Sequence, residues 1–139
     1  MAIKQLSVLI ENKKGSMADV VKIISDANIN IRAMSVADSA DFGILRLIVS
    51  DIEKAKELVS EDTIVKATEV LAVKMDDIEG ALYKILTVLE AAEINVEYSY
   101  AFTAHKDGSA YVVFRVDDVA TAEKLLSQKG FSFATQEDI

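Results

Sequence analysis

The spacing of hydrophobic residues changes along the chain between two periods. Apolar and polar side chains alternate over residues 5–10, which is typical of a strand with one face on a core. Over residues 17–27 the apolar side chains recur three and four positions apart, as on one face of a helix. The pattern then predicts strands over 29–37 and 44–49, a short helix that starts near 52, and a strand near 64–68.

The second half of the chain repeats this order. A shift of 65 residues places Gly15 on Gly80 and Asn30 on Asn95, and a shift of 67 places Asp51 on Asp118. An insertion at residues 104–108 explains the change of shift, and its Asp-Gly pair is a hairpin signal. Nothing resembling a linker separates the copies. We therefore predict two domains packed together, residues 1–68 and 69–139, with the last strand of the second near 131–135.

Each copy reads as strand, helix, strand, strand, helix, strand. Two tandem βαββαβ units predict an α+β fold of the ferredoxin-like type, with antiparallel sheets and helices on one face. Asp51 and Asp118 are positioned to cap the second helix of each unit.

The sheet face away from the helices is predicted to be apolar as well. Ile48 and Val113 are expected there, and Tyr98, Tyr100 and Phe102 add aromatic area at strand spacing. One interpretation is that a second chain covers this face in a homodimer, so that charge reversal at Ile48 or Val113 dissociates it while each unit stays folded. The other is that the three rings pack beneath the helices.

Composition excludes several classes of function. The 139 residues include no Cys and one His, which leaves no disulfide, no thiolate metal site and no thiol nucleophile. The formal net charge of -8 argues against a nucleic-acid partner, because phosphate binding needs clustered Lys and Arg. No apolar run approaches the roughly 20 residues that span a membrane, and no signal peptide begins the chain, so we expect a cytoplasmic protein.

Gly15 and Gly80 each stand at a predicted strand-to-helix turn. A glycine there lets a ligand approach the backbone, and the free N–H groups of the first helical turn suit a carboxylate. The alternative is that each glycine serves only the turn.

Two segments carry a resemblance to a known family. Residues 11–17 (ENKKGSM) precede Ile-Asn-Ile at 29–31, and residues 76–82 (DDIEGAL) precede Ile-Asn-Val at 94–96. This arrangement resembles a tandem pair of ACT domains, as in the stand-alone two-domain proteins that carry no attached enzyme. The resemblance implies a regulatory protein that binds a small free amino acid, without catalysis or cofactor. The apolar sheet face predicts a homodimer, and a metabolic enzyme is a further candidate partner. The Pro that often precedes the Gly in this family is replaced by Lys14 and Glu79.

The resemblance also implies where the ligand binds. The amino acid would lie between paired domains, with Asn12 and Gly15 facing Asn95, and Asp77 and Gly80 facing Asn30. A ligand-binding His of some family members is replaced by Ile10 here. The two Asn at 30 and 95 have a second interpretation, as residues that tolerate the helix-to-strand bend. The full set of predicted ligand residues is Asn12, Lys14, Gly15, Ser16, Met17, Asn30, Asp77, Gly80, Ala81, Leu82 and Asn95.

Charge separates the two predicted sites. Residues 1–68 carry 9 basic and 10 acidic side chains, and residues 69–139 carry 6 and 13. Lys13 and Lys14 flank the first glycine, whereas Asp76, Asp77 and Glu79 flank the second. We predict that the first site is the stronger one for a carboxylate. The acidic trio suits a helix N-terminus, and a divalent-cation site is the sharper alternative, although no metal is predicted.

Three further residues have two interpretations each. His105 is expected to be a solvated loop residue, or a contact across an oligomer interface. Arg46 and Arg115 are expected on the open sheet face, where they pair with carboxylates or bind an acid in a dimer.

Two other functions compete with amino-acid sensing. A ligand-free interaction module would modulate an enzyme without binding a small molecule. An acylphosphatase-like enzyme would need an Arg beside a phosphate loop, and neither glycine loop contains one.

Overall fold

The computed structural model describes residues 2–104 and 108–139, so His105 lies outside the described residues. The chain divides into two compact units. The first comprises Lys4–Thr68, and the second comprises Glu69–Ile139 with Ala2 and Ile3. Among the described residues, no helix has the length and apolar character needed to cross a membrane.

The first unit begins with β1 (Ile3–Glu11) and α1 (Ser16–Asp26). The strands β2 (Ile31–Asp38) and β3 (Phe42–Val49) form a hairpin, and α2 (Ile52–Val59) leads into the start of β4 (Val65–Met75). The sheet order is β2-β3-β1-β4, and β3 pairs antiparallel with both β1 and β2.

The second unit contains the rest of β4, then α3 (Ala81–Ala91), β5 (Val96–Thr103), β6 (Ala110–Val116) and α4 (Val119–Gln128). Its sheet order is β4-β6-β5, with antiparallel pairing, and a 3-10 turn at Gln136–Asp138 ends the chain.

The strand predicted at 131–135 is reduced to one bridge between Val73 and Phe133. Two backbone hydrogen bonds of 2.8 Å flank it, from Lys74 to Ser132 and from Ala134 to Ala72. The segment is short because Gly130 before it is left-handed, and a capping box at Thr135 begins the final turn.

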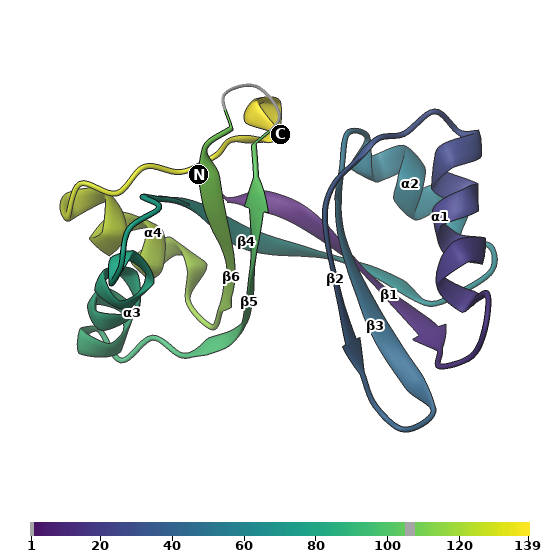
Figure 1. Ribbon diagram of the computed structural model, residues 1–139, viewed down its shortest axis with the longest axis horizontal. Coiled ribbons are helices and arrows are strands. Elements are labelled where there is room, and N and C mark those ends of the chain that lie inside the picture. The colour runs from purple at the N-terminus through teal and green to yellow at the C-terminus, as the bar shows by residue number, and fades with distance from the viewer. Residues whose placement is uncertain (1, 105–107) are drawn as a thin grey trace. The chain divides into compact units, whose positions relative to one another are not determined.

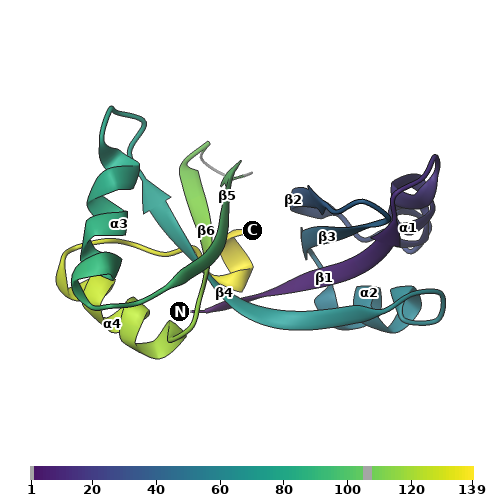
Figure 2. The same ribbon diagram turned by 90° about the horizontal axis from the view of Figure 1, so that it is seen from below.

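In each unit both helices lie on one face of the sheet (Figures 1 and 2). The core of the first unit contains Leu6 and Leu47 from the sheet and Ile24 from α1. In the second unit Leu71 and Phe114 pack with Ile85 and Leu126. The predicted α+β fold, with ferredoxin-like units and helices on one face, is confirmed.

The predicted helix caps are also present. Asp51 accepts a hydrogen bond of 3.2 Å from the amide of Lys54, and Asp118 accepts one of 3.1 Å from the amide of Thr121. Each carboxylate thereby satisfies one of the amides that a helix N-terminus leaves without a partner.

The rings of Tyr98, Tyr100 and Phe102 lie on the sheet face away from the helices. Their register partners on β6 are Arg115, Val113 and Tyr111, whereas the helix-facing core uses the alternate residues of β6. The ring of Phe102 stacks on that of Tyr111 at a centroid distance of 5.5 Å. The interpretation that these rings pack beneath the helices is therefore wrong.

Ile48 and Val113 are both fully buried within the single chain. Charge reversal at either position would place an unpaired charge in the interior, and would destabilise the fold rather than only dissociate a dimer. Exposed apolar side chains on this face lie elsewhere, at Phe42 (47% exposed) and Ile44 (37%).

Arg115 pairs with a carboxylate, as one of its two interpretations predicted. Its Nε lies 3.1 Å from a carboxylate oxygen of Glu97, and Nη1 donates to the backbone oxygen of Glu69. Arg46 lies at the equivalent place in the first unit, opposite Ser7 and Ser35.

Candidate functional site

The two predicted glycine loops share one backbone conformation. Gly15 and Gly80 have φ of 84° and 80° and directly precede α1 and α3, with no side chain capping either helix. A Cβ added to either glycine would meet no atom within 4 Å. The backbone angle, and not crowding, therefore requires glycine here, and the space beside each glycine is open.

Each loop presents unused hydrogen-bond donors. The amide of Ser16 donates to Lys13 at 3.4 Å and that of Ala81 to Ile78 at 3.3 Å, both at the long end of the range. The next two amides of each helix have no acceptor among the described residues; they belong to Met17, Ala18, Leu82 and Tyr83. Such amides, at the positive end of a helix dipole, attract an anion.

Asn12 ties the first loop to the β2–β3 turn. Its backbone amide donates to Asp41 at 2.9 Å, and its side-chain Nδ2 donates to the backbone oxygen of Ser39 at 3.3 Å. Within the described residues its amide oxygen accepts no hydrogen bond, and the side chain is exposed. The equivalent residue, Asp77, makes no hydrogen bond in that part of the chain.

A cavity of about 170 Å³ lies between the first loop, α1 and the β2–β3 hairpin. It includes Asn12, Ser16 and Met17 of the predicted ligand residues, but neither Lys14 nor Gly15 is part of its lining. The complete lining is Ile10, Glu11, Asn12, Lys13, Ser16, Met17, Val36, Asp38 and Gly43.

The corresponding cavity beside the second loop is larger, about 420 Å³. Four of the predicted residues line it, namely Asp77, Gly80, Ala81 and Leu82. Met75, Asp76, Ile78, Tyr83 and Leu86 complete the lining.

Sequence reasoning missed the part of the first cavity that β2 and β3 supply. Val36, Asp38 and Gly43 enter it because the hairpin folds back beside the loop, a contact between residues more than 20 positions apart. In the second cavity, Tyr83 was also missed, although it directly follows the predicted ligand residues Ala81 and Leu82 on the first turn of α3.

Asn30 and Asn95 line neither cavity. Their backbone amides donate to Ser50 Oγ at 2.9 Å and to Asp117 Oδ1 at 3.1 Å, and both residues are exposed. Within the first unit α1 separates Asn12 from Asn30, because eleven helical residues span about 16 Å. One unit therefore does not bring these two predicted ligand residues together.

The bend between helix and strand uses other residues. The left-handed positions are Asn28 (φ 58°) and Glu93 (φ 57°), which lie two residues before Asn30 and Asn95. The bend therefore does not explain why asparagine occupies positions 30 and 95.

The two loops differ in charge. Lys13 forms an ion pair of 2.9 Å with Glu11, and the hydrogen bond that its ammonium group donates to this carboxylate raises the pKa of Lys13 above its ordinary value. Lys14 remains the cation of the first loop without an ion pair in the described residues. The acidic residues of the second loop, Asp76, Asp77 and Glu79, likewise have none. Among the described residues, no three His, Cys, Asp or Glu side chains are grouped to hold a metal ion.

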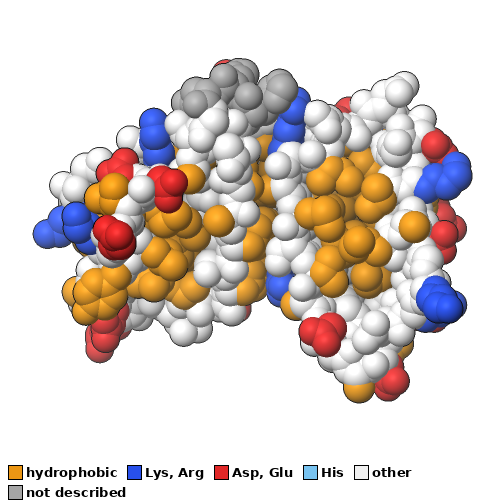
Figure 3. All heavy atoms as spheres, viewed as in Figure 1, with side chains coloured by type: hydrophobic (Ala, Val, Ile, Leu, Met, Phe, Trp, Pro, Cys, Tyr) orange, Lys and Arg blue, Asp and Glu red, His pale blue; other side chains and the backbone are white. Residues whose placement is uncertain are grey.

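Apolar side chains surround both loops. Figure 3 shows them gathered between β2 and α1 in the first unit and between α3 and β5 in the second. In the first unit Met17 of α1 (42% exposed) and Met34 and Val36 of β2 (44% and 47%) are exposed apolar residues. Each loop thus combines anion-attracting amides with apolar contact area, which suits a small amphiphilic molecule such as an amino acid.

Comparisons with solved structures support the fold. Protein BT0572 from Bacteroides thetaiotaomicron is 35% identical, with a TM-score of 0.91; the match covers 99% of this chain and 95% of that one. The ligand-free regulatory subunit of aspartate kinase from Thermus thermophilus is 12% identical with a TM-score of 0.64, over 91% of this chain and 92% of that one. The same subunit from Thermus flavus is 11% identical with a TM-score of 0.62, over 90% of each chain. The two Thermus subunits share the fold of this chain.

No curated protein matches the chain. The family model described as an ACT domain pair matches residues 1–139, which confirms the resemblance inferred from the two glycine loops. Because that match spans the whole sequence, the chain belongs to the ACT domain pair family.

Proposed function

We propose that this protein is a non-catalytic, cytoplasmic regulator that binds a small free amino acid at its glycine loops. The observation that carries this proposal is the repeated arrangement of a left-handed glycine, an uncapped helix N-terminus and an adjoining cavity. Membership of the ACT domain pair family supports it.

In the first loop the ligand carboxylate accepts hydrogen bonds from the amides of Met17 and Ala18. The Asn12 amide oxygen accepts from the ligand ammonium, since an amide can read both ends of an amino acid. The ligand side chain lies against Met17 and Val36. Following the family resemblance, the proposed domains are residues 1–68 and 69–139. A paired domain contributes Asn95 to the site at Asn12, and a paired domain contributes Asn30 to the site at Asp77.

We rank the first loop as the stronger site. Asp77 replaces the donor and acceptor of Asn12 with acceptors only, and Asp76 and Glu79 add charge that repels a ligand carboxylate. Lys14 contributes the opposite charge beside Gly15.

Regulation requires a partner that responds to the ligand. We propose a homodimer, assembled through the exposed apolar residues beside β2, that modulates a metabolic enzyme in the ligand-dependent state. Two of the similar solved structures are regulatory subunits of aspartate kinase, which supports a role of this kind.

A thermal-shift screen against the twenty amino acids tests the proposal. A ligand at 100 times its Kd adds about 2.7 kcal/mol to the free energy of unfolding, which raises the melting temperature by several degrees. No shift with any amino acid at millimolar concentration would favour the ligand-free interaction module. Acyl phosphate turnover, measured in parallel, would instead reveal an acylphosphatase-like enzyme.

An exchange of the two equivalent polar residues tests the site. Asn12→Ala removes a hydrogen bond to a charged group, worth about 1.5–3 kcal/mol, so affinity falls about 10- to 150-fold. Asn12→Asp weakens the first site, and Asp77→Asn strengthens the second. Calorimetry measures each Kd, and the melting temperature without ligand controls for the lost bond to Ser39. Loss of binding only upon substitution of Asp77 would reverse the ranking.

A further inference from the structure

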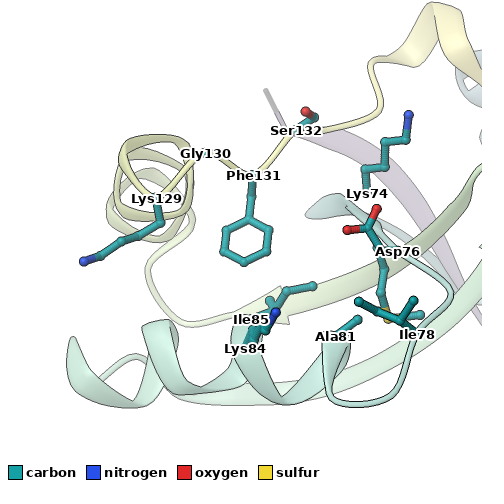
Figure 4. Close-up of a pocket in the computed structure, with 11 residues that line it drawn as sticks. Lys74, Asp76, Ile78, Ala81, Lys84, Ile85, Lys129, Gly130, Phe131 and Ser132 are labelled. Carbon is teal, nitrogen blue, oxygen red and sulfur yellow. The ribbon is translucent and has the colours of Figure 1, made fainter.

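A second groove adjoins the glycine-loop cavity of the second unit at the first turn of α3. It occupies about 200 Å³ between the end of β4, the first turns of α3 and the segment that follows α4 (Figure 4). Ala81 lines both cavities, whereas Lys84 and Ile85 line only this groove and Leu82 and Leu86 line only the glycine-loop cavity. The two cavities therefore adjoin at the first turn of α3 and use different residues of the helix beyond it.

The floor of the groove is apolar and its rim is cationic. Ile85 and the ring of Phe131 lie at its centre, and the lysines Lys74, Lys84 and Lys129 surround them. Figure 4 shows the ring between Lys129 on one side and Lys74 on the other. None of the three lysines forms an ion pair with the described part of the chain, although the carboxylate of Asp76 also lines the groove.

This concentration of positive charge does not follow from composition. Residues 69–139 carry 13 acidic side chains and only 6 basic ones. Half of those basic side chains line this one groove. Basic side chains that served only to keep the unit hydrated would be spread over its whole surface.

The corresponding cavity of the first unit carries an acid at two of the three lysine positions. The shifts of 65 and 67 residues place Asp19 on Lys84 and Asp62 on Lys129, and both Asp line a cavity between β1, α1 and the segment after α2. The lysines of that cavity, Lys13 and Lys22, form ion pairs with nearby carboxylates. The fold therefore does not require a cationic rim, and the lysines are particular to the second unit.

We propose that the groove at Lys74, Lys84, Lys129 and Phe131 binds a small organic anion, a carboxylate with an apolar body. The lysines neutralise the carboxylate, and Phe131 and Ile85 contact the body. The volume is below the 300–1,000 Å³ typical of drug-sized ligands, which suits a smaller molecule. This site goes beyond the proposed amino-acid site: the groove shares Met75, Asp76, Ile78 and Ala81 with the second glycine-loop cavity, but its three lysines and Phe131 lie outside that cavity.

Three probes distinguish the sources of affinity in the full chain. Benzoate supplies the charge and the apolar body, benzamide supplies the same shape without charge, and inorganic phosphate supplies charge alone. We expect benzoate to cause saturable amide shifts at Gly130, Phe131 and Ser132 in NMR titrations, with benzamide and phosphate at least tenfold weaker. Equal binding of benzamide would overturn the role of the lysines, and equal binding of phosphate would overturn the organic ligand. Absence of shifts with benzoate at millimolar concentration would overturn the site.

Charge variants locate the site. Lys84→Asp and Lys129→Gln each weaken benzoate binding at least tenfold. The matched control Lys124→Asp, an exposed position on α4 outside the groove, changes it less than twofold. Lys84→Asp places an acid near a helix N-terminus, where it is tolerated, and Lys129→Gln avoids an acid at a helix C-terminus. Equal weakening by all three would mean general electrostatic attraction and overturn the site. Tyr83→Ala, which alters the second glycine-loop cavity and not the groove, leaves benzoate binding unchanged; weaker binding by this variant would place benzoate in that cavity and overturn the groove.

Discussion

At the scale of single residues, equivalent positions of the two units solve the same backbone problem with different side chains. The bend after the first helix of each unit needs a left-handed residue, and the chain supplies Asn28 in one unit and Glu93 in the other. Asparagine tolerates this conformation through its short polar side chain, whereas a longer side chain at positive φ is strained.

Substitution at Glu93 should therefore stabilise the protein. We expect Glu93→Asn to raise the free energy of unfolding by about 0.5–1 kcal/mol, part of the roughly 1–2 kcal/mol that the left-handed region costs an ordinary residue. Chemical denaturation measures the change. Asn28→Ala is the matched control and should lower stability by a similar amount; a loss of stability in both variants would show that Glu93 is not strained.

The cap of α4 should make stability depend on pH. Hydrogen bonds from the hydroxyl and the amide of Thr121 lower the pKa of Asp118 below its ordinary value. A carboxyl with a depressed folded-state pKa contributes stability that is present above its unfolded pKa, about 3.9, and is lost as the pH falls through the folded value.

Asp118→Ala should consequently lower the melting temperature at pH 7, and the difference from the unchanged protein should disappear in acid, below about pH 4. Thermal unfolding followed by circular dichroism between pH 2.5 and 7 measures both curves. Asp118→Asn keeps a capping oxygen but cannot titrate, so it should retain more stability than Ala at neutral pH. A constant difference between Asp118→Ala and the unchanged protein at every pH would contradict the assignment.

At the scale of elements, the edge strands β2 and β5 differ in what they expose. The exposed positions of β5 carry small or polar side chains such as Ser99, whereas β2 exposes Met34 and Val36 beside Met17 of α1. An edge strand flanked by apolar side chains is a template for pairing with another chain. We therefore expect β2, with α1, to form the homodimer contact.

Sedimentation at micromolar concentration should show a dimer whose interface buries more than about 1,000 Å². Met34→Lys should shift it toward monomer without lowering the melting temperature of the monomer, because this side chain is 44% exposed. Ser99→Lys, the matched change on β5, should leave the dimer intact. Dissociation by Ser99→Lys alone would assign the interface to the other edge strand.

Sequence patterns predicted the elements well where the physics is local. Hydrophobic spacing identified the helices, and Asp51 and Asp118 were recognisable as caps because a cap depends on residues three positions apart. The strand expected at 131–135 is a single bridge in the structure, because Gly130 and the final turn limit its length. The burial of Ile48 and Val113 was not predictable, since alternation gives the face of a strand but not what covers it.

At the scale of the whole molecule, the candidate site was predictable in part. The repeat located both glycine loops, because the same local geometry recurs at a fixed spacing in the sequence. The contribution of Val36 and Asp38 depends on the β2–β3 hairpin and could not be read from spacing. The reversal of charge from Asp19 and Asp62 to Lys84 and Lys129 depends on which residues line the same groove, and that is set by the folded chain.

The continuity of β4 determines where the protein resists a protease. Most proteins with two units offer an exposed connecting segment to cleavage, but here the change of unit falls between Thr68 and Glu69, inside one strand. Residues Val70–Val73 are fully buried, and β4 pairs with β6 from Leu71 onward. A protease needs an extended, accessible segment, so limited trypsin digestion should cut after Lys13 or Lys14 before it cuts after Lys66. An early pair of half-length fragments in mass spectrometry would show that β4 opens locally. A protease would then be able to separate the two units of the chain.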